Sequence, residues 1–273
     1  MLLRSCKFII VICLIFILPS CVWGQYSYGT TGLLHMPTAD MQKDKTFLFG
    51  ASYLNKNMTP SPQWDYNTFN YYVNITFFPW LEISYDLTLN QGKPGGYWPK
   101  RTWYKFVNQD RQFSARFRLW KEGWYYDWTP QIVLGTNDPA NHEHNGGGKI
   151  IIDDDESGHS HTSHFTRFYL TATKHIVFES VGEIGAHAAL IYSREDNNYF
   201  TRPAVGANFE LQLLETDKWQ KWVNGLNLMG EFDGEGINVG ASYKIWRDNI
   251  NVIAELHECK YFSGGIYFKL HLR

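Results

Sequence analysis

Apolar and polar side chains alternate at every second position along most of this chain, most clearly at residues 69–77, 184–192, 205–213 and 237–245. Successive side chains of a β-strand point to opposite faces, whereas an amphipathic helix repeats its apolar residues every three to four positions. The best helical candidate, residues 215–223 (ETDKWQKWV), is consistent with one interfacial turn. We therefore expect an all-β protein whose strands each have one apolar and one polar face.

About twelve segments show this alternation, and most are about 8–11 residues long, which is the length that a tilted strand needs to cross a bilayer. They cover residues 47–53, 69–77, 81–89, 113–119, 130–136, 164–173, 184–192, 205–213, 226–232, 237–245, 250–256 and 266–272. Connections 55–67, 91–110 and 137–163 are long, whereas 78–80, 121–129 and 174–182 are short. Long loops at one end and tight turns at the other, with both termini at the tight-turn end, are typical of an antiparallel outer-membrane β-barrel. A soluble sandwich or lipocalin-like barrel stays open, because a water-facing sheet alternates in the same way.

Tryptophan positions favour the membrane barrel. Aromatic residues make up 17% of the chain, and seven tryptophans fall at predicted strand ends or turns on the tight-turn side. They are Trp80, Trp120, Trp124, Trp128, Trp219, Trp222 and Trp246. Amphipathic indole rings collect at membrane–water interfaces, so we interpret this group as a girdle at the periplasmic rim.

Composition excludes several other classes of protein. The mean hydropathy of −0.35 excludes a helical protein that crosses the membrane many times, which would need several apolar runs of ~20 residues. Lys and Arg number 25 against 27 Asp and Glu, and this net charge of −2 offers no electrostatic reason to bind nucleic acid. With 44% apolar and 19% charged residues, the chain can build a folded domain.

The first residues predict export. Arg4 and Lys7 precede an unbroken apolar run at 8–18, which is too short to span a bilayer but right for a signal-peptide core. We expect a signal peptide at 1–24, a periplasmic segment at 25–45 that leads into the barrel, and the barrel itself at 46–273. Residues 18–21 also resemble a lipobox, in which case Cys21 would be lipidated. Cys259 is the one cysteine of the remaining chain, so we expect no internal disulfide.

Charged residues of both signs fall on the polar faces that would line the lumen. They are Glu82, Asp86, Glu210, Glu231, Glu255, Arg116, Arg118, Arg167, Lys244 and Lys269. Such charges could pair and close the lumen, or they could line a narrow channel for a zwitterionic or sugar-like solute. If a sugar docks, we expect the rings of Trp98, Trp103 and Tyr104 to stack on it. Arg116 and Arg118 would meet acidic sugars from inside the barrel.

The predicted loop at 137–163 is rich in imidazoles and carboxylates. His142, His144, Asp154, His159 and His161 could hold zinc or calcium, although their spacing fits no standard closed site and a solvated loop explains it as well. The sequence contains no G-x-S-x-G, P-loop or H-E-x-x-H motif. We therefore expect a protein that is not an enzyme and needs no cofactor.

Residues 29–40 (GTTGLLHMPTAD), followed by 45–50 (KTFLFG), resemble the YjbH family, also labelled YbjH exopolysaccharide-biosynthesis proteins. Residues 76–84, 108–114, 130–138 and 165–174 are similar to the same family, and the chain resembles its short, single-barrel versions of the Bacteroidetes type most. The resemblance implies an outer-membrane β-barrel that assists exopolysaccharide or capsule production or export, without catalysis. Its implied partners are outer-membrane lipid, surface polysaccharide and export or assembly proteins.

The residues themselves leave two other functions open. A polar lumen would suit a small-solute channel, and a soluble or lipid-anchored periplasmic β binding module would fit a water-facing sheet. In the 29–40 motif, Gly29 and Gly32 allow a tight turn and Pro37 restricts the chain before the first strand. We expect these residues to specify the periplasmic entrance of the barrel rather than to bind a ligand.

Overall fold

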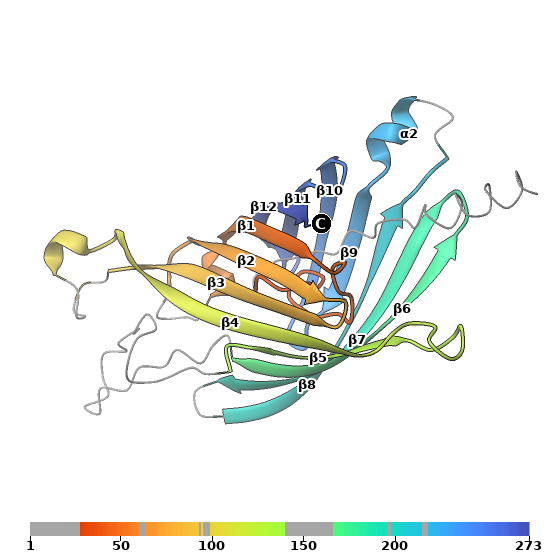
Figure 1. Ribbon diagram of the computed structural model, residues 1–273. Coiled ribbons are helices and arrows are strands. Elements are labelled where there is room, and N and C mark those ends of the chain that lie inside the picture. The colour runs from red at the N-terminus through yellow and green to blue at the C-terminus, as the bar shows by residue number, and fades with distance from the viewer. Residues whose placement is uncertain are drawn as a thin grey trace, which may run out of the picture.

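Each alternating segment forms a β-strand in the computed structural model, which describes residues 28–59, 64–92, 94, 99–139, 166–195, 198–214 and 218–272. Neighbouring strands pair antiparallel in chain order, and β1 (Thr46–Leu54) also pairs with β12 (Tyr261–His271). The sheet therefore closes on itself as a twelve-strand barrel (Figure 1). The all-β antiparallel barrel predicted from the alternation is confirmed.

The remaining strands are β2 (Thr68–Phe78), β3 (Leu81–Gln91), β4 (Phe106–Trp120), β5 (Gln131–Asn137), β6 (Arg167–Phe178), β7 (Gly182–Glu195), β8 (Asn198–Leu211), β9 (Leu226–Phe232), β10 (Ile237–Trp246) and β11 (Ile250–His257). Short helical turns lie in the connections: η1 (Lys56–Met58), η2 (Lys100–Thr102) and α2 (Lys218–Val223). None of the helices in the described part of the chain has the length and hydropathy to cross a membrane.

Three strands begin five or more residues earlier than their alternation predicts. β4 starts at Phe106 rather than at Phe113, β8 at Asn198 rather than at Val205, and β12 at Tyr261 rather than at Ile266. In the added part of β4, Gln109 and Arg111 point outward and the buried Asp110 points inward, so both faces of the strand are polar there. Backbone pairing with β3 continues through this part although the hydropathy pattern has stopped.

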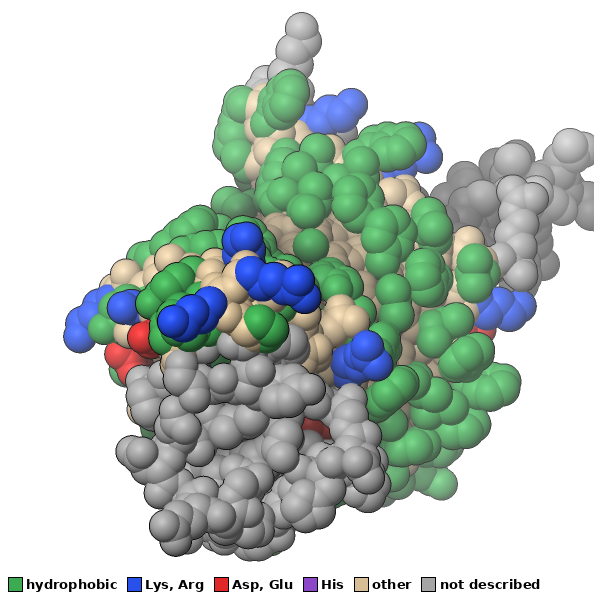
Figure 2. Space-filling model, turned by 90° about the vertical axis from the view of Figure 1, so that its left-hand side faces the viewer, with side chains coloured by type: hydrophobic (Ala, Val, Ile, Leu, Met, Phe, Trp, Pro, Cys, Tyr) green, Lys and Arg blue, Asp and Glu red, His purple; other side chains and the backbone are tan. Residues whose placement is uncertain are grey.

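The polarity of the barrel is reversed relative to a soluble protein. Inward side chains of β2 and β3 such as Asn74, Glu82 and Asp86 are buried, whereas outward side chains such as Phe69 and Phe113 are exposed, Phe113 by 61%. Viewed from the end that carries η2, hydrophobic side chains cover much of the visible outer wall (Figure 2). Water-soluble monomers rarely expose continuous apolar patches larger than a few hundred Å².

The two ends of the barrel differ in their connections. One, here called the long-loop end, contains connections 55–67, 92–105 and 138–166, together with the short turns at 233–236 and 258–260. The other, the tight-turn end, contains connections 79–80, 121–130, 179–181, 212–225 and 247–249. The start of β1 and the end of β12 also lie at this end. All seven tryptophans predicted at one rim lie at this tight-turn end, in or beside these connections.

Candidate functional site: a plug inside the barrel

The chain passes through the inside of the barrel before it reaches β1. Residues 29–42, which we call the plug, are buried almost throughout and contact inward side chains from β2 to β11. In Figure 1 the plug is the red-orange loop enclosed by the strands. The segment predicted to lead into the barrel thus reaches β1 from within the lumen.

The plug is a compact loop that fits against glycines of the wall. Leu33 donates its N–H to the Met36 carbonyl over 3.1 Å, which closes the turn. A Cβ at Gly206 of β8 would lie 2.6 Å from Leu33 Cδ1, and a Cβ at Gly240 of β10 would lie 2.7 Å from Leu34 Cδ2. Both distances are below van der Waals contact, so a larger residue at either inward position would press on a leucine of the plug.

Glu231 of β9 is the main polar anchor on one side. Its carboxylate accepts backbone N–H bonds from Leu34 at 3.0 Å, His35 at 2.6 Å and Met36 at 3.2 Å. Asn238 on the neighbouring strand donates to the same carboxylate over 3.1 Å. Because the turn leaves these N–H groups without strand partners, one carboxylate satisfies three donors that would otherwise be buried and unpaired.

Glu82 of β3 anchors the opposite side. It accepts the backbone N–H of Thr31 at 2.8 Å and the Thr31 hydroxyl at 2.7 Å. Arg116 of β4 donates to Glu82 at 3.0 Å and also to the Thr38 carbonyl. Arg116 is fully buried, so the side chain predicted to meet an acidic sugar binds the plug instead in this conformation.

A histidine cluster holds the end of the plug nearest β1. Asp40 lies 3.5 Å from Nε2 of His175 and 3.6 Å from Nδ1 of His187, and burial raises the pKa of Asp40 although both imidazoles oppose this. Glu122, in the β4–β5 connection, bonds the His175 ring at 2.6 Å. Burial disfavours the charged form of Glu122, but the hydrogen bonds from His175 and Lys174 outweigh it and lower its pKa to about 2.

The lumen charges divide between wall pairs and plug contacts. Lys244 bonds Glu210 at 2.6 Å and Lys269 bonds Asp248 at 3.1 Å, both near the tight-turn end. Arg167 instead donates to the His35 carbonyl at 2.8 Å. Of the charges predicted to line the lumen, Glu82 pairs with Arg116 and Glu210 with Lys244, whereas Glu231 and Arg167 bond the plug.

The other predicted ligand-binding residues do not join Arg116 in one site. Arg116 opposes Glu82 at the start of β3, whereas Trp103 bridges Gly92 just beyond the other end of that strand. Tyr104, beside Trp103, is 72% exposed. Arg118 is half-buried, and its guanidinium donates a hydrogen bond to Oε1 of Gln131 over 3.4 Å. Trp98, Cys21 and the predicted metal ligands His142, His144, Asp154, His159 and His161 lie outside the described residues.

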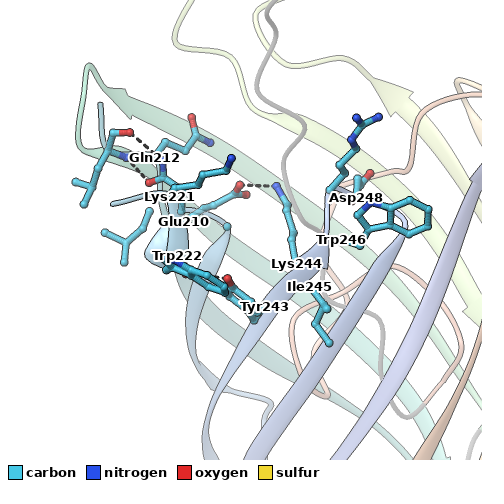
Figure 3. Close-up of a pocket in the computed structure, with 14 residues that line it drawn as sticks. Glu210, Gln212, Lys221, Trp222, Tyr243, Lys244, Ile245, Trp246 and Asp248 are labelled. Atoms are coloured by element: carbon cyan, nitrogen blue, oxygen red, sulfur yellow. Dashed lines mark hydrogen bonds and ion pairs between the residues drawn. The ribbon is translucent and has the colours of Figure 1, made fainter. Parts of the chain in front are cut away.

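A hollow lies in the barrel wall at the tight-turn end, between α2, β8 and β10 (Figure 3). β9 lies between β8 and β10 and starts only at Leu226. The end of β8 at Leu211 and the end of β10 at Trp246 therefore have no part of β9 between them. The hollow has a volume of about 1000 Å³ and is lined by aromatic Trp222, Tyr243 and Trp246. The Lys244–Glu210 ion pair crosses it. The sequence predicted only an interfacial turn here, because the divergence of two strands leaves no local pattern.

A comparison with family models connects the plug to a known family. Residues 24–142 match the model described as exopolysaccharide biosynthesis protein YbjH, family YjbH. We call these residues the YjbH segment, after the family whose model they match. The YjbH segment contains the plug, β1 to β5, and the anchors Glu82 and Arg116, whereas Glu231 lies beyond it. A search of curated proteins found no match.

Proposed function

We propose that this protein is a non-catalytic outer-membrane β-barrel that assists the production or export of an exopolysaccharide. The observation that carries the proposal is a plug of YjbH sequence inside a barrel whose apolar side chains face outward. The family match supports the link to exopolysaccharide biosynthesis, and the outward-facing apolar side chains support insertion into a membrane.

The outer surface supports membrane insertion on energetic grounds. Phe69, Phe113, Leu134, Leu170 and Val205, from five different strands, are each at least 44% exposed on the outer wall. Transfer of apolar surface out of water is favourable by about 25 cal/mol per Å². A bilayer would cover these side chains, and the closed barrel satisfies its backbone hydrogen bonds internally, as the hydrocarbon core requires.

The plug bears on the small-solute alternative. A permanently open channel would need a hydrated path, but the plug and its anchors Glu82, Arg116 and Glu231 occupy the middle of the lumen. Passage of a polymer or solute would require the plug to move, so we interpret the described conformation as a resting state.

Three measurements test the proposal. Deletion of the gene should change the amount or composition of cell-surface polysaccharide, and the wild-type gene should restore it; unchanged polysaccharide would reject the role. Membrane insertion is tested separately by fractionation. Release by carbonate without detergent would reject the transmembrane barrel and favour a soluble or lipid-anchored module, whereas a detergent-extracted band that shifts on boiling in SDS would support the barrel.

A further inference from the structure

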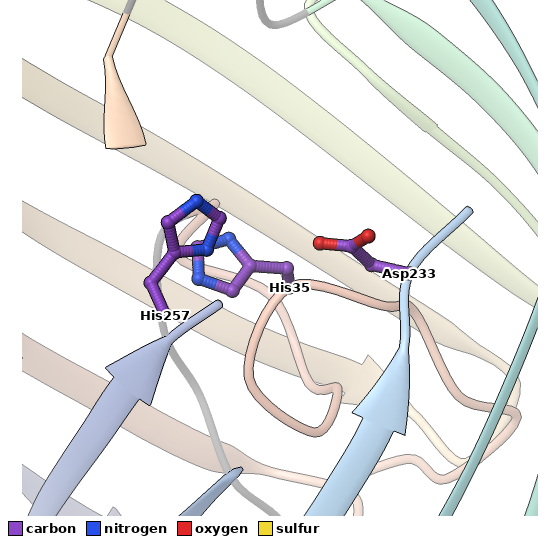
Figure 4. A group of neighbouring side chains, drawn as sticks. All are labelled: His35, Asp233 and His257. Carbon is purple, nitrogen blue, oxygen red and sulfur yellow. The ribbon is translucent and has the colours of Figure 1, made fainter. Parts of the chain in front are cut away.

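Three potential metal ligands meet inside the barrel at the long-loop end, where the tip of the plug approaches the wall (Figure 4). His35 comes from the plug, Asp233 from the turn after β9, and His257 is the last residue of β11. One ligand atom of each lies within 4.8 Å of the others. The rings of His35 and His257 have centroids 5.0 Å apart, and Asp233 points toward them from the opposite side.

Two further observations show donor atoms available for a ligand. Among the described residues, Nδ1 of His257 and Oε2 of Glu255 are buried and have no hydrogen-bond partner. Glu255 is 2% exposed and lies two residues before His257, so both face inward from β11. The other carboxylate oxygen of Glu255 lies 3.0 Å from Nε2 of His35. An imidazole nitrogen and a carboxylate oxygen on the same face of β11 are therefore available to bind a ligand next to His35.

The electrostatic surroundings suit a divalent cation. Three carboxylates approach His35. Glu255 lies 3.0 Å from its Nε2, Glu231 accepts its backbone N–H at 2.6 Å, and a carboxylate oxygen of Asp233 lies within 4.8 Å of a ring nitrogen. The negative charges of all three would attract a divalent cation held by the histidines.

The donor set and its support fit a zinc-like ion. Two imidazoles with carboxylate oxygens are typical zinc ligands, and tetrahedral donors around zinc lie about 3.3 Å apart. The 4.8 Å group would have to contract by about 1.5 Å, which side-chain rotation of a histidine can supply. Asp233 is already oriented by the N–H groups of Glu235 and Gly236, each at 2.9 Å. Such outer contacts fix a ligand in place.

A small cavity gives access to the group. It has a volume of about 110 Å³ and is lined by His35, Asp233 and His257 together with two arginines. Arg202 is paired with Glu235, which offsets its charge, whereas Arg167 donates to the neutral His35 carbonyl and keeps its charge. The carboxylates of Glu255, Glu231 and Asp233 near His35 outnumber this one cation.

We propose that His35, Asp233 and His257, with Glu255 as a fourth donor, bind a divalent transition-metal ion such as zinc, which ties the plug to the barrel wall. The ion joins residues that are far apart in the sequence: His35 belongs to the YjbH segment, and the other three lie beyond it. Because the site exists only while the plug is in place, metal binding stabilises the plugged state by mass action. This inference does not depend on a role in polysaccharide export.

The test is a calorimetric titration with zinc. Full-length protein, solubilised in detergent and treated with a chelator, is titrated and the heat of binding is measured. The background replaces the loop histidines His142, His144, His159, His161 and His164 with asparagine, so that those imidazoles cannot contribute. We expect one zinc per chain, and at least tenfold weaker binding in His257→Asn and in Asp233→Asn. The matched control His271→Asn removes another inward histidine, whose ring contacts Thr46 and Asp248 rather than the plug, and should bind as the background does.

Heat-modifiability in SDS shows that each variant is folded, and Asp233→Asn carries the test if His257→Asn fails to fold, because an asparagine keeps the turn contacts. X-ray absorption at the zinc edge should show two imidazole ligands in the background protein and one in His257→Asn. Zinc affinity that is the same in both variants as in the background, or no zinc binding once the loop histidines are removed, would overturn the proposal.

Discussion

Glu231→Gln should loosen the plug without unfolding the barrel. The carboxylate of Glu231 accepts three plug N–H groups at 2.6–3.2 Å, and glutamine keeps its size but retains one acceptor oxygen and no charge. A hydrogen bond to a charged group contributes roughly 1.5–3 kcal/mol. Allowing for the relief of burying one charge less, we expect the plug to lose about 3 kcal/mol of stabilisation. Since 1.4 kcal/mol is a factor of ten, the displaced population should rise about 100-fold.

Thiol labelling of Leu34→Cys measures this population directly. Leu34 is 3% exposed, so a reagent reaches the thiol only when the plug is displaced. The labelling rate is read by mass spectrometry of the peptide that contains residue 34, because Cys259 is exposed and also reacts. The matched control is Glu210→Gln, which removes an equally buried inward carboxylate that pairs with Lys244 rather than with the plug. Equal labelling rates in the two variants would refute the anchoring role of Glu231.

Three further predictions concern the wall and the turn beside the plug. Gly206→Val should raise labelling in the same assay by one to two orders of magnitude, because overpacking costs about 1–3 kcal/mol and a Cβ there would overlap Leu33 and Met36 of the plug; an unchanged rate would contradict this fit. The pKa of Glu122 is lowered to about 2, so its bond to His175 should stabilise the barrel fully above pH 4.5 and be lost as the pH falls toward 2. Urea unfolding at pH 7 and pH 3 should show a smaller pH dependence of the unfolding free energy in Glu122→Gln than in the wild type. Equal dependence would rule out a stabilising bond between Glu122 and His175. Arg116→Met leaves Glu82 buried without its cation and should lower the free energy of unfolding by about 3–5 kcal/mol, while Arg116→Met/Glu82→Gln should recover part of that loss; a double variant as unstable as the single one would argue against the pair.

The strand content of the barrel could be predicted because its signal is local. At residues 69–77 the outward side chains must match hydrocarbon and the inward ones must be polar, so the alternation marks the strand and its faces. The same reasoning began β4 too late, because residues 108–112 are polar on both faces and pairing with β3 alone extends the strand there. Connection lengths and rim tryptophans are equally local, and they predicted the two ends.

The plug has no such signal. Residues 29–42 lack a period, and their glycines and proline predict a turn without saying which side of the barrel holds it. Glu231 and Gly206 are likewise ordinary inward strand residues in the sequence. Their roles depend on contacts across the lumen, with a sequence separation of 197 residues between Leu34 and Glu231.

The sequence by itself therefore determined the barrel, its inside-out polarity and its two unlike ends, because each follows from the period of a strand and the solvent on its two faces. Only the tertiary structure decided what fills the lumen and which donors meet at His35, Asp233 and His257. Closure of the sheet brings together side chains from strands that never pair. No local sequence pattern encodes which of these side chains meet across the lumen.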